Sequence, residues 1–197
     1  SYQGNIKSIE IRLMAGETAL TSTSDVMFRM KELAVQAAND TLGAADRKTI
    51  SLEMTELRNQ IVSLANSQDS NGNYLFAGSR VSQMPFSPDA KGVIVYKGDQ
   101  ARMVGGVGDN RRMNLNLPGS DAFVRVVREN QKGEKSGVDF FQVLADAVTA
   151  IEAGDSTDTQ RAVLEVDALQ NGITESLGQV GADLTVVDMQ TNVLDET

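Results

Sequence analysis

Apolar residues recur every three or four positions over the first forty residues of the chain, which is the spacing of one helix face. The stripe consists of Ile6, Ile9, Leu13, Gly16, Leu20, Thr23, Met27, Met30, Ala34 and Ala37. Its 3.5-residue period predicts a helix with a coiled-coil seam, about 55 Å long at roughly 1.5 Å per residue. We expect the helix to end near Gly43, because glycine commonly follows the last helical turn.

A second, shorter stripe follows this break. Asp46 is of a type that caps helices, and the apolar residues after it are again spaced by four and three. They are Ile50, Met54, Leu57, Ile61 and Leu64. The two segments should form a helical hairpin, in which each stripe needs a further helix to cover it.

The C-terminal sixty residues supply that cover. A short helix is predicted up to Gly154 by Phe141, Leu144, Val148 and Ile151. A long helix is predicted after it, and one extra residue shifts the register of its apolar stripe. The stripe consists of Val166, Leu169, Ile173, Leu177, Val180, Leu184, Val187 and Leu194. We therefore predict that the two ends of the chain pack lengthwise against each other.

Residues 70–136 differ in kind from the helical segments. They hold all three Pro, nine of the seventeen Gly and five of the nine aromatic residues. The segments 93–96 and 101–104 flank Lys97-Gly98-Asp99-Gln100, which predicts a β-hairpin. Residues 112–117 alternate polar and apolar, as a half-buried strand does.

The predicted fold class is therefore α+β. Residues 1–69 and 137–197 would form an elongated antiparallel helical bundle, or rod, made from both chain ends. A small β-rich domain, residues 70–136, would be inserted between them.

Composition narrows the possible functions. The chain has no His and no Cys, so it lacks the commonest general base and every thiolate nucleophile, disulfide and zinc–sulfur site. The net charge of −9 is uneven: residues 70–136 carry ten Lys/Arg against six Asp/Glu, whereas twelve acids after Gly137 accompany one base, Arg161. An acidic helical part argues against nucleic acid, and no apolar run approaches the roughly 20 residues that span a bilayer. We expect no catalytic residues, cofactor, metal, nucleic-acid partner or membrane partner.

Three loops are possible ligand sites. Asp69-Ser70-Asn71-Gly72-Asn73 begins like a calcium loop, but Tyr74 and Arg80 occupy positions that need Gly and Glu, so a turn is expected. Gly105-Gly106-Val107-Gly108 lacks the Lys-Ser/Thr of a phosphate loop and predicts a bulge or turn. The basic residues Arg111, Arg112, Arg125 and Arg128 form either a solvated strand face or a surface complementary to an acidic neighbour, such as the helices of another copy.

One long motif carries a family resemblance. Residues 29–41, RMKELAVQAANDT, followed by Asp46-Arg47 and Glu53, closely resemble the N-terminal conserved helices of bacterial flagellins. Residues 72–78, GNYLFAG, look like the signature that follows the second helix in the branch of hook-associated protein three, at the hook–filament junction. Val180-Gly181-Ala182-Asp183-Leu184 is similar to a further motif, with Asp183 where the family commonly has Arg.

The resemblance implies a structural adaptor of the bacterial flagellum. Its expected partners are flagellin, another hook-associated protein, copies of itself in a ring and an export chaperone. The protein would be extracellular, exported through the flagellar secretion apparatus, and its N-terminus shows no cleavable signal pattern. We expect the chain to be a core fragment without the family's outermost terminal segments, and to be monomeric.

Two sets of residues are candidate sites. In flagellins, the face that bears Arg29, Leu33 and Gln36, with Glu53 nearby, contacts neighbouring subunits. Here the three helix residues share one face by their spacing, although a solvated ridge is an equal alternative.

The second set is the predicted junction between rod and β-rich domain. Tyr74 and Phe76 would wedge into the core of the smaller domain, while Gly72 and Gly78 relieve crowding of the backbone. Two other functions stay open: a flagellin filament subunit, and an extracellular binding module that acts through the β-rich domain.

Overall fold

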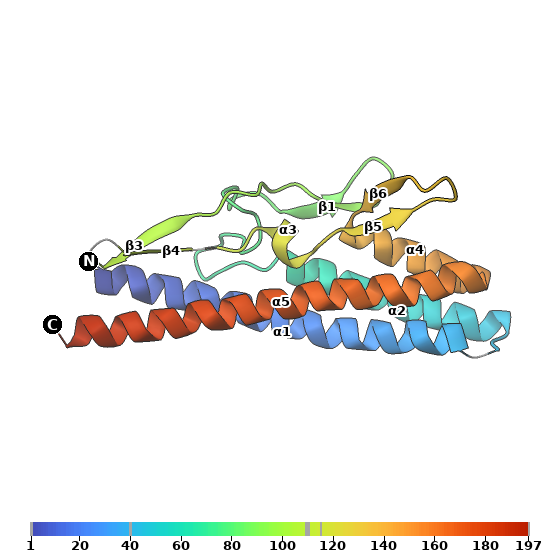
Figure 1. Cartoon of the computed structure of the whole chain (residues 1–197), viewed down its shortest axis with the longest axis horizontal. Coiled ribbons are helices and arrows are strands. Elements are labelled where there is room, and N and C mark those ends of the chain that lie inside the picture. Colours follow the sequence, from blue (N-terminus) through green and yellow to red (C-terminus); the bar gives the residue numbers. More distant parts are fainter. Residues whose placement is uncertain (1, 40, 109–110, 115, 197) are drawn as a thin grey trace.

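Four helices form a rod in the computed structural model, which describes residues 2–39, 41–108, 111–114 and 116–196. Helices α1 (Tyr2–Asn39) and α5 (Ser156–Asp195) lie side by side, antiparallel, along the whole rod (Figure 1). Helices α2 (Ala44–Ala65) and α4 (Phe140–Ala153) pack on them over the half of the rod away from the two termini.

The aliphatic seam is the centre of the rod. Of the predicted α1 stripe, every residue from Ile6 to Ala34 is buried, and Ala37 is half-buried. On α5 the buried members are Val166, Leu169, Ile173, Val180 and Val187. The predicted lengthwise packing of the two chain ends is confirmed by the contacts between α1 and α5. Each apolar stripe is removed from water by packing against the other.

The helix ends follow the prediction with one correction. Helix α4 ends at Gly154, which adopts the left-handed conformation (φ 72°), and the Asp155 carboxylate caps α5 by accepting from the Asp158 N–H at 2.8 Å. The prediction of Asp46 as the cap of α2 is wrong. Gly43 holds that position without a side-chain bond, and Asp46 lies in the first turn, where its charge still favours the helix dipole.

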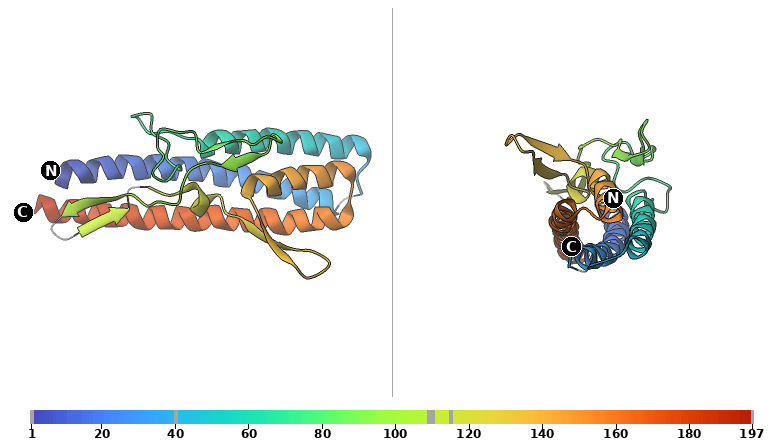
Figure 2. Two further views of the ribbon diagram at one scale, coloured as in Figure 1. Left: turned by 90° about the horizontal axis from the view of Figure 1, so that it is seen from above. Right: turned by 90° about the vertical axis from the view of Figure 1, so that its right-hand side faces the viewer.

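The described residues outside the rod form three two-stranded antiparallel sheets and one short helix, α3 (Gly119–Ala122). The strand pairs are β1 (Phe86–Pro88) with β2 (Ile94–Tyr96), β3 (Val104–Gly108) with β4 (Arg111–Asn114), and β5 (Val126–Glu129) with β6 (Lys135–Val138). The pairs follow one side of the rod, and the β5–β6 hairpin stands away from it (Figure 2). The fold class is α+β, as predicted.

The predicted hairpin around Lys97–Gln100 is wrong. Strand β2 pairs with β1, upstream of it, and Val104 belongs to β3. The Asp99 carboxylate explains the difference: it accepts from the Ser79 N–H at 2.8 Å and from the Ala101 N–H at 3.1 Å. These bonds fold the loop back onto the segment after α2, so its flanking runs cannot pair with each other.

Strand β4 is shorter than the predicted strand 112–117. Leu115 lies outside the described residues, and Asn116 is buried instead of facing water. Its amide nitrogen donates to Gly78 O at 2.9 Å, and its amide oxygen accepts from Met103 N at 2.7 Å. The predicted bulge in the glycine run is confirmed by a register shift between Gly106 and Gly108.

Three turns share one design. In each, the side-chain oxygen of Asp69, Asp89 or Asn130 accepts from the backbone N–H groups two and four residues later. A glycine three residues after it has a positive φ: Gly72, Gly92 and Gly133. This is the Asx-turn chemistry with glycine in the left-handed position, and it makes Asp69 a turn residue, as predicted.

Candidate functional site: the rod surface and its junction with the β-hairpins

The predicted subunit-contact residues lie where α1 and α2 meet. The Arg29 guanidinium donates to both Glu53 carboxylate oxygens, from Nη2 at 2.9 and 3.0 Å and from Nε at 3.2 Å. Both side chains stay about half exposed, so this fork joins the helices while leaving a polar face toward solvent.

The other two residues of that set differ from each other. Gln36 is exposed, but Leu33 is only 2% exposed and belongs to the aliphatic core. A buried leucine cannot contact a neighbouring molecule, so the available face comprises Arg29, Gln36 and Glu53. Phe28, which precedes Arg29 and is 56% exposed, was not singled out from the sequence because it lies outside the periodic stripe.

The junction turn is fastened to α1 by one arginine. Arg12 Nη1 donates to Asp69 Oδ2 at 2.6 Å, and Nη2 donates to the Tyr74 carbonyl at 3.0 Å. Both charged side chains are largely buried, which strengthens the interaction relative to a surface pair. Periodicity gave no indication of this pair, because Arg12 lies beside the apolar stripe and its partner is 57 residues away.

The two junction glycines have different roles. Gly72 has φ +79° and open space around it, so its conformation and not crowding requires glycine. Gly78 has φ +66°, and a Cβ there would overlap the Asp99 carboxylate and carbonyl. The hydrogen bonds from Ser79 hold the pKa of the Asp99 carboxyl below its usual value. Burial raises the pKa of Tyr96, whose hydroxyl donates to the Asp99 carbonyl, to about 12.

An aromatic cluster joins the β-hairpins to the rod. Its members are Phe76, Phe86, Tyr96, Phe123, Phe140 and Phe141. Phe123 is central, with ring centroids 5.6 Å from Phe76, 5.0 Å from Phe86 and 5.2 Å from Phe140. Phe76 is buried in this cluster, whereas Tyr74 is half-buried and makes no ring contact in the described part of the chain.

A second attachment, missed by sequence reasoning, lies farther along. Arg128 on β5 donates to both Glu165 oxygens on α5, at 2.7 and 2.9 Å, and to Asp146 on α4 at 2.8 Å. The hydrogen bonds to Glu165 raise the pKa of the Arg128 guanidinium most, and the bond to Asp146 raises it further. Arg125 pairs with Asp139 at 2.8 Å. The acidic neighbour of these arginines is thus in the same chain, and no residue type near Arg128 in the sequence distinguishes it from Arg112.

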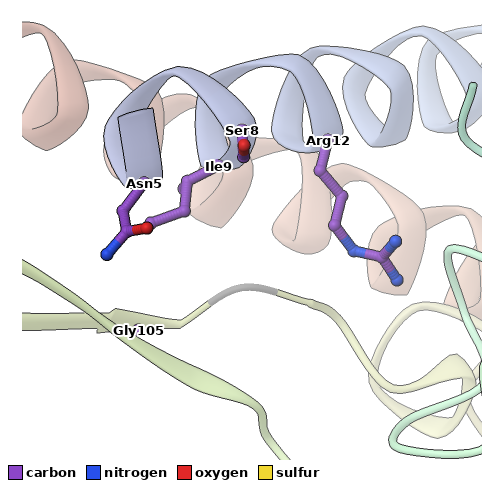
Figure 3. A pocket seen from close by; sticks show the side chains of 5 residues that line it. All are labelled: Asn5, Ser8, Ile9, Arg12 and Gly105. Atoms are coloured by element: carbon purple, nitrogen blue, oxygen red, sulfur yellow. The ribbon is translucent and has the colours of Figure 1, made fainter. Parts of the chain in front are cut away.

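A shallow groove of about 220 Å³ runs between α1 and β3. Asn5, Ser8, Ile9, Arg12 and Gly105 line it (Figure 3). Among the described residues that line it, Arg12 alone is ionisable, and that side chain is already bound to Asp69. The groove therefore brings together no acid–base pair for a reaction.

The described residues contain no group of three or more His, Cys, Asp or Glu arranged to hold a metal ion. Within the same ranges, none of the helices combines the length and apolar character needed to cross a bilayer.

Comparison with known proteins points to one family. Residues 3–81 match the bacterial flagellin N-terminal helical region. Flagellar hook-associated protein 3 of Salmonella typhimurium strain LT2 is 28% identical over 171 residues, and that of Escherichia coli K12 is 29% identical over 170. Each alignment covers 83% of the chain and 53% of the relative. The chain thus spans about half the length of the curated relatives it matches.

Flagellins are also among the relatives. Flagellin FlaB1 of Treponema pallidum is 27% identical over 165 residues, which is 84% of this chain and 50% of that protein. A shorter stretch of 69 residues is 38% identical to a flagellin of Clostridium tyrobutyricum and covers 35% of this chain and 18% of that protein.

Solved structures share the fold. Xanthomonas campestris FlgL superposes with a TM-score of 0.89 at 23% identity, covering 99% of this chain and 93% of that one. The flagellar junction protein FlgL of Legionella pneumophila gives 0.84 at 17% identity, covering 95% of each chain. The chain is thus similar to the bacterial flagellin N-terminal helical region over residues 3–81 and to hook-associated protein 3 over most of its length, and it shares the fold of FlgL.

Proposed function

We propose that this chain is part of a structural adaptor of the bacterial flagellum, which joins the hook, through another hook-associated protein, to the flagellin filament. The observation that carries the proposal is the similarity to hook-associated protein 3 along 83% of the chain, together with the fold of FlgL. The adaptor acts by packing of subunits, and its partners are flagellin, another hook-associated protein, further copies in a ring and an export chaperone. It is extracellular and reaches the flagellum through the flagellar secretion apparatus.

Deletion of the gene tests this role. Cells without the adaptor should assemble hooks but release flagellin into the medium, because filaments have no base on which to grow. A filament subunit is the alternative that the Treponema pallidum flagellin supports. Loss of a sole flagellin would leave hooks with no flagellin in the medium, so the medium distinguishes the two functions.

The domain division rests on the contacts at the junction. We propose that residues 70–136 form an outer unit on a rod of residues 1–69 and 137–197. Gly72, Tyr74, Phe76 and Gly78 would set its angle to the rod. The Phe76 ring and the Arg12–Asp69 pair support this role, since both connect the junction to other elements.

The face with Arg29, Gln36 and Glu53 is proposed as a contact between subunits. Arg29→Glu alone removes the Glu53 fork as well as the exposed charge, so it should impair both stability and incorporation at hook tips. The exchange of charges, Arg29→Glu with Glu53→Arg, restores an internal pair. Incorporation that stays lost in a chain of restored stability would support a contact role, whereas full recovery would leave only the internal role.

A further inference from the structure

Two Asn-Gly pairs occur in the chain, Asn71-Gly72 and Asn171-Gly172. This dipeptide is prone to deamidation, because glycine has no side chain to hinder its backbone nitrogen from attacking the amide carbon of the preceding asparagine. The first pair lies in the turn after α2, and the second lies inside α5. The same chemistry is therefore available at two places with different freedom of the backbone.

The pair in α5 is held away from reaction. Gly172 is buried, and a Cβ on it would lie 2.8 Å from Val124, so this part of the helix is closely packed. In a helix interior the N–H points along the axis to the carbonyl four residues earlier, whereas the Asn171 side chain projects outward. Attack at Asn171 requires the helix to open, and helix interiors open far less often than turns.

The pair in the turn is open to solvent. Asn71 and Gly72 are both exposed, and the Asn71 side-chain amide forms no hydrogen bond with any other described residue, so it is free to rotate. One bond restrains the attacking nitrogen, since the Gly72 N–H donates to the Asp69 carbonyl at 3.0 Å. A single bond in an exposed turn breaks more readily than a run of bonds inside a packed helix.

A third asparagine before a small residue, Asn66-Ser67, is protected in another way. The Asn66 amide donates to the Phe86 carbonyl at 2.8 Å and accepts from the Phe86 N–H at 3.0 Å. Rotation of this amide toward the Ser67 nitrogen would break both bonds. Burial, helical structure or hydrogen bonding thus restrains the other two asparagines, and none of these restrains the side chain of Asn71.

We propose that Asn71 is the deamidation site of the folded chain and that its conversion loosens the junction turn. The Gly72 nitrogen forms a bond to the side-chain carbonyl carbon of Asn71, and its proton leaves with the side-chain nitrogen as ammonia. Water then opens the resulting succinimide ring. Opening at the side-chain carbonyl gives aspartate. Opening at the backbone carbonyl gives isoaspartate, in which the chain continues through the former side chain and is one carbon longer.

The extra carbon lies where the turn depends on a fixed number of backbone atoms. The Asp69 carboxylate accepts from the N–H groups of Asn71 at 2.8 Å and Asn73 at 3.0 Å. The Asp69 N–H donates to the Asn73 carbonyl at 2.8 Å. Both bonds to Asn73 span the insertion between Asn71 and Gly72. Because the same carboxylate binds Arg12, loss of the turn weakens the attachment of the junction to α1.

Ageing of the purified chain at mildly alkaline pH, followed by peptide mapping with mass spectrometry, tests the site. In the folded chain Asn71 should deamidate about tenfold or more faster than Asn171. In urea the two rates should lie within about twofold of each other, because neither the turn nor the helix remains. Asn71→Gln should nearly abolish conversion at this position, since glutamine must form a larger ring. Asn171→Gln is the matched control and should leave the rate at Asn71 unchanged.

Hydrogen exchange of the aged chain tests the effect on the turn. Isoaspartate at position 71 should speed exchange of the Asn73 N–H about tenfold, because its bond to Asp69 is lost, while α5 keeps its protection. Asn71→Asp adds the same charge without the extra carbon, and should change exchange at Asn73 by less than about twofold.

Two outcomes would overturn the proposal. Deamidation of Asn171 at least as fast as that of Asn71 in the folded chain would refute the site. Unchanged exchange at Asn73 in a chain that carries isoaspartate would refute the effect on the turn. Neither measurement needs a partner protein, so both results are independent of the proposed adaptor role.

Discussion

The rod and the hairpin side of this molecule are stabilised in different ways. The rod buries one continuous aliphatic seam between α1 and α5, to which many side chains along both helices contribute. The hairpins have sheets of only two strands each in the described residues, too small to be stable on their own. They depend on a few specific attachments: the aromatic cluster, the Arg12–Asp69 pair, the Arg128 fork and the buried amide of Asn116.

This difference implies different responses to substitution. Loss of one side chain from a long seam leaves its neighbours in contact, so the damage is graded. Loss of a central attachment releases a hairpin that has little else to hold it. Substitutions in both regions can test that contrast, from the largest expected effect to the smallest.

Phe123→Ala should have the largest effect. Removal of a buried phenylalanine from the centre of the aromatic cluster should lower the free energy of unfolding by about 3–5 kcal/mol. Hydrogen exchange should accelerate first in residues 70–139 and later in α1 and α5. Phe28→Ala, at a 56% exposed ring, is the control and should cost no more than about 0.5 kcal/mol. Equal losses in the two variants would contradict the contrast.

Arg128→Met tests the second attachment. The Glu165 side chain is only 9% exposed, and without the Arg128 fork its remaining ion pair among the described residues is the long contact with Arg161 at 3.8 Å, so the loss should cost about 2 kcal/mol in the free energy of unfolding. Arg125→Met breaks a pair in which both side chains are more than half exposed, and should cost less than about 0.5 kcal/mol. Urea titration of both variants measures the difference. An equal loss of unfolding free energy in Arg125→Met would show that burial does not explain the contribution of Arg128.

Two glycines sharpen the comparison inside the rod. Gly16 lies in a helix, and no described atom beyond its chain neighbours and the nearby backbone of that helix comes within 4 Å of the point where an alanine methyl would sit, so Gly16→Ala should stabilise the protein by about 1 kcal/mol. At Gly172 a Cβ would lie 2.8 Å from Val124, so Gly172→Ala should lose that gain or destabilise the protein. Thermal unfolding decides the sign. Stabilisation at both positions would show that helix propensity outweighs the contact with Val124.

The smallest effects concern two carboxyl groups with opposite shifts. Burial raises the pKa of Asp183, so its ionised form costs stability at neutral pH, and the cost disappears as the pH falls through the raised value. Asp183→Asn should therefore raise the melting temperature slightly at pH 7, and the gain should vanish below pH of about 4.

Asp99 should behave in the opposite way. Hydrogen bonds from Ser79 lower its pKa, so the carboxylate stabilises the fold above the usual Asp pKa and loses that contribution as the pH falls through the lowered value. Asp99→Asn should lower the melting temperature at pH 7 and make little difference in strong acid. Melting curves of both variants from pH 7 to pH 2 should thus converge on the original chain from opposite sides.

The sequence alone was sufficient to predict the helical rod. A period of 3.5 residues sustained over forty positions admits one kind of structure, so the long helices, the burial of residues such as Leu20 and Ile173, and their lengthwise packing were all predictable. Helix ends were predictable where glycine decides them, as at Gly154, and not where a glycine replaced the expected cap, as at Gly43.

Only the tertiary structure decided how the hairpins pair and what holds them. Strands of three to five residues carry too short a pattern to specify a partner strand. Here the hydrogen bonds of the Asp99 carboxylate fold the loop after β2 so that β2 pairs with β1. The same applies to side chains whose role depends on distant residues. Leu33 looked like part of an exposed face but is core, and Arg128 looked like surface charge but binds two helices. The spacing of apolar residues depends on local helix or strand geometry. The roles of Leu33 and Arg128 depend instead on residues that the fold brings together from distant parts of the chain.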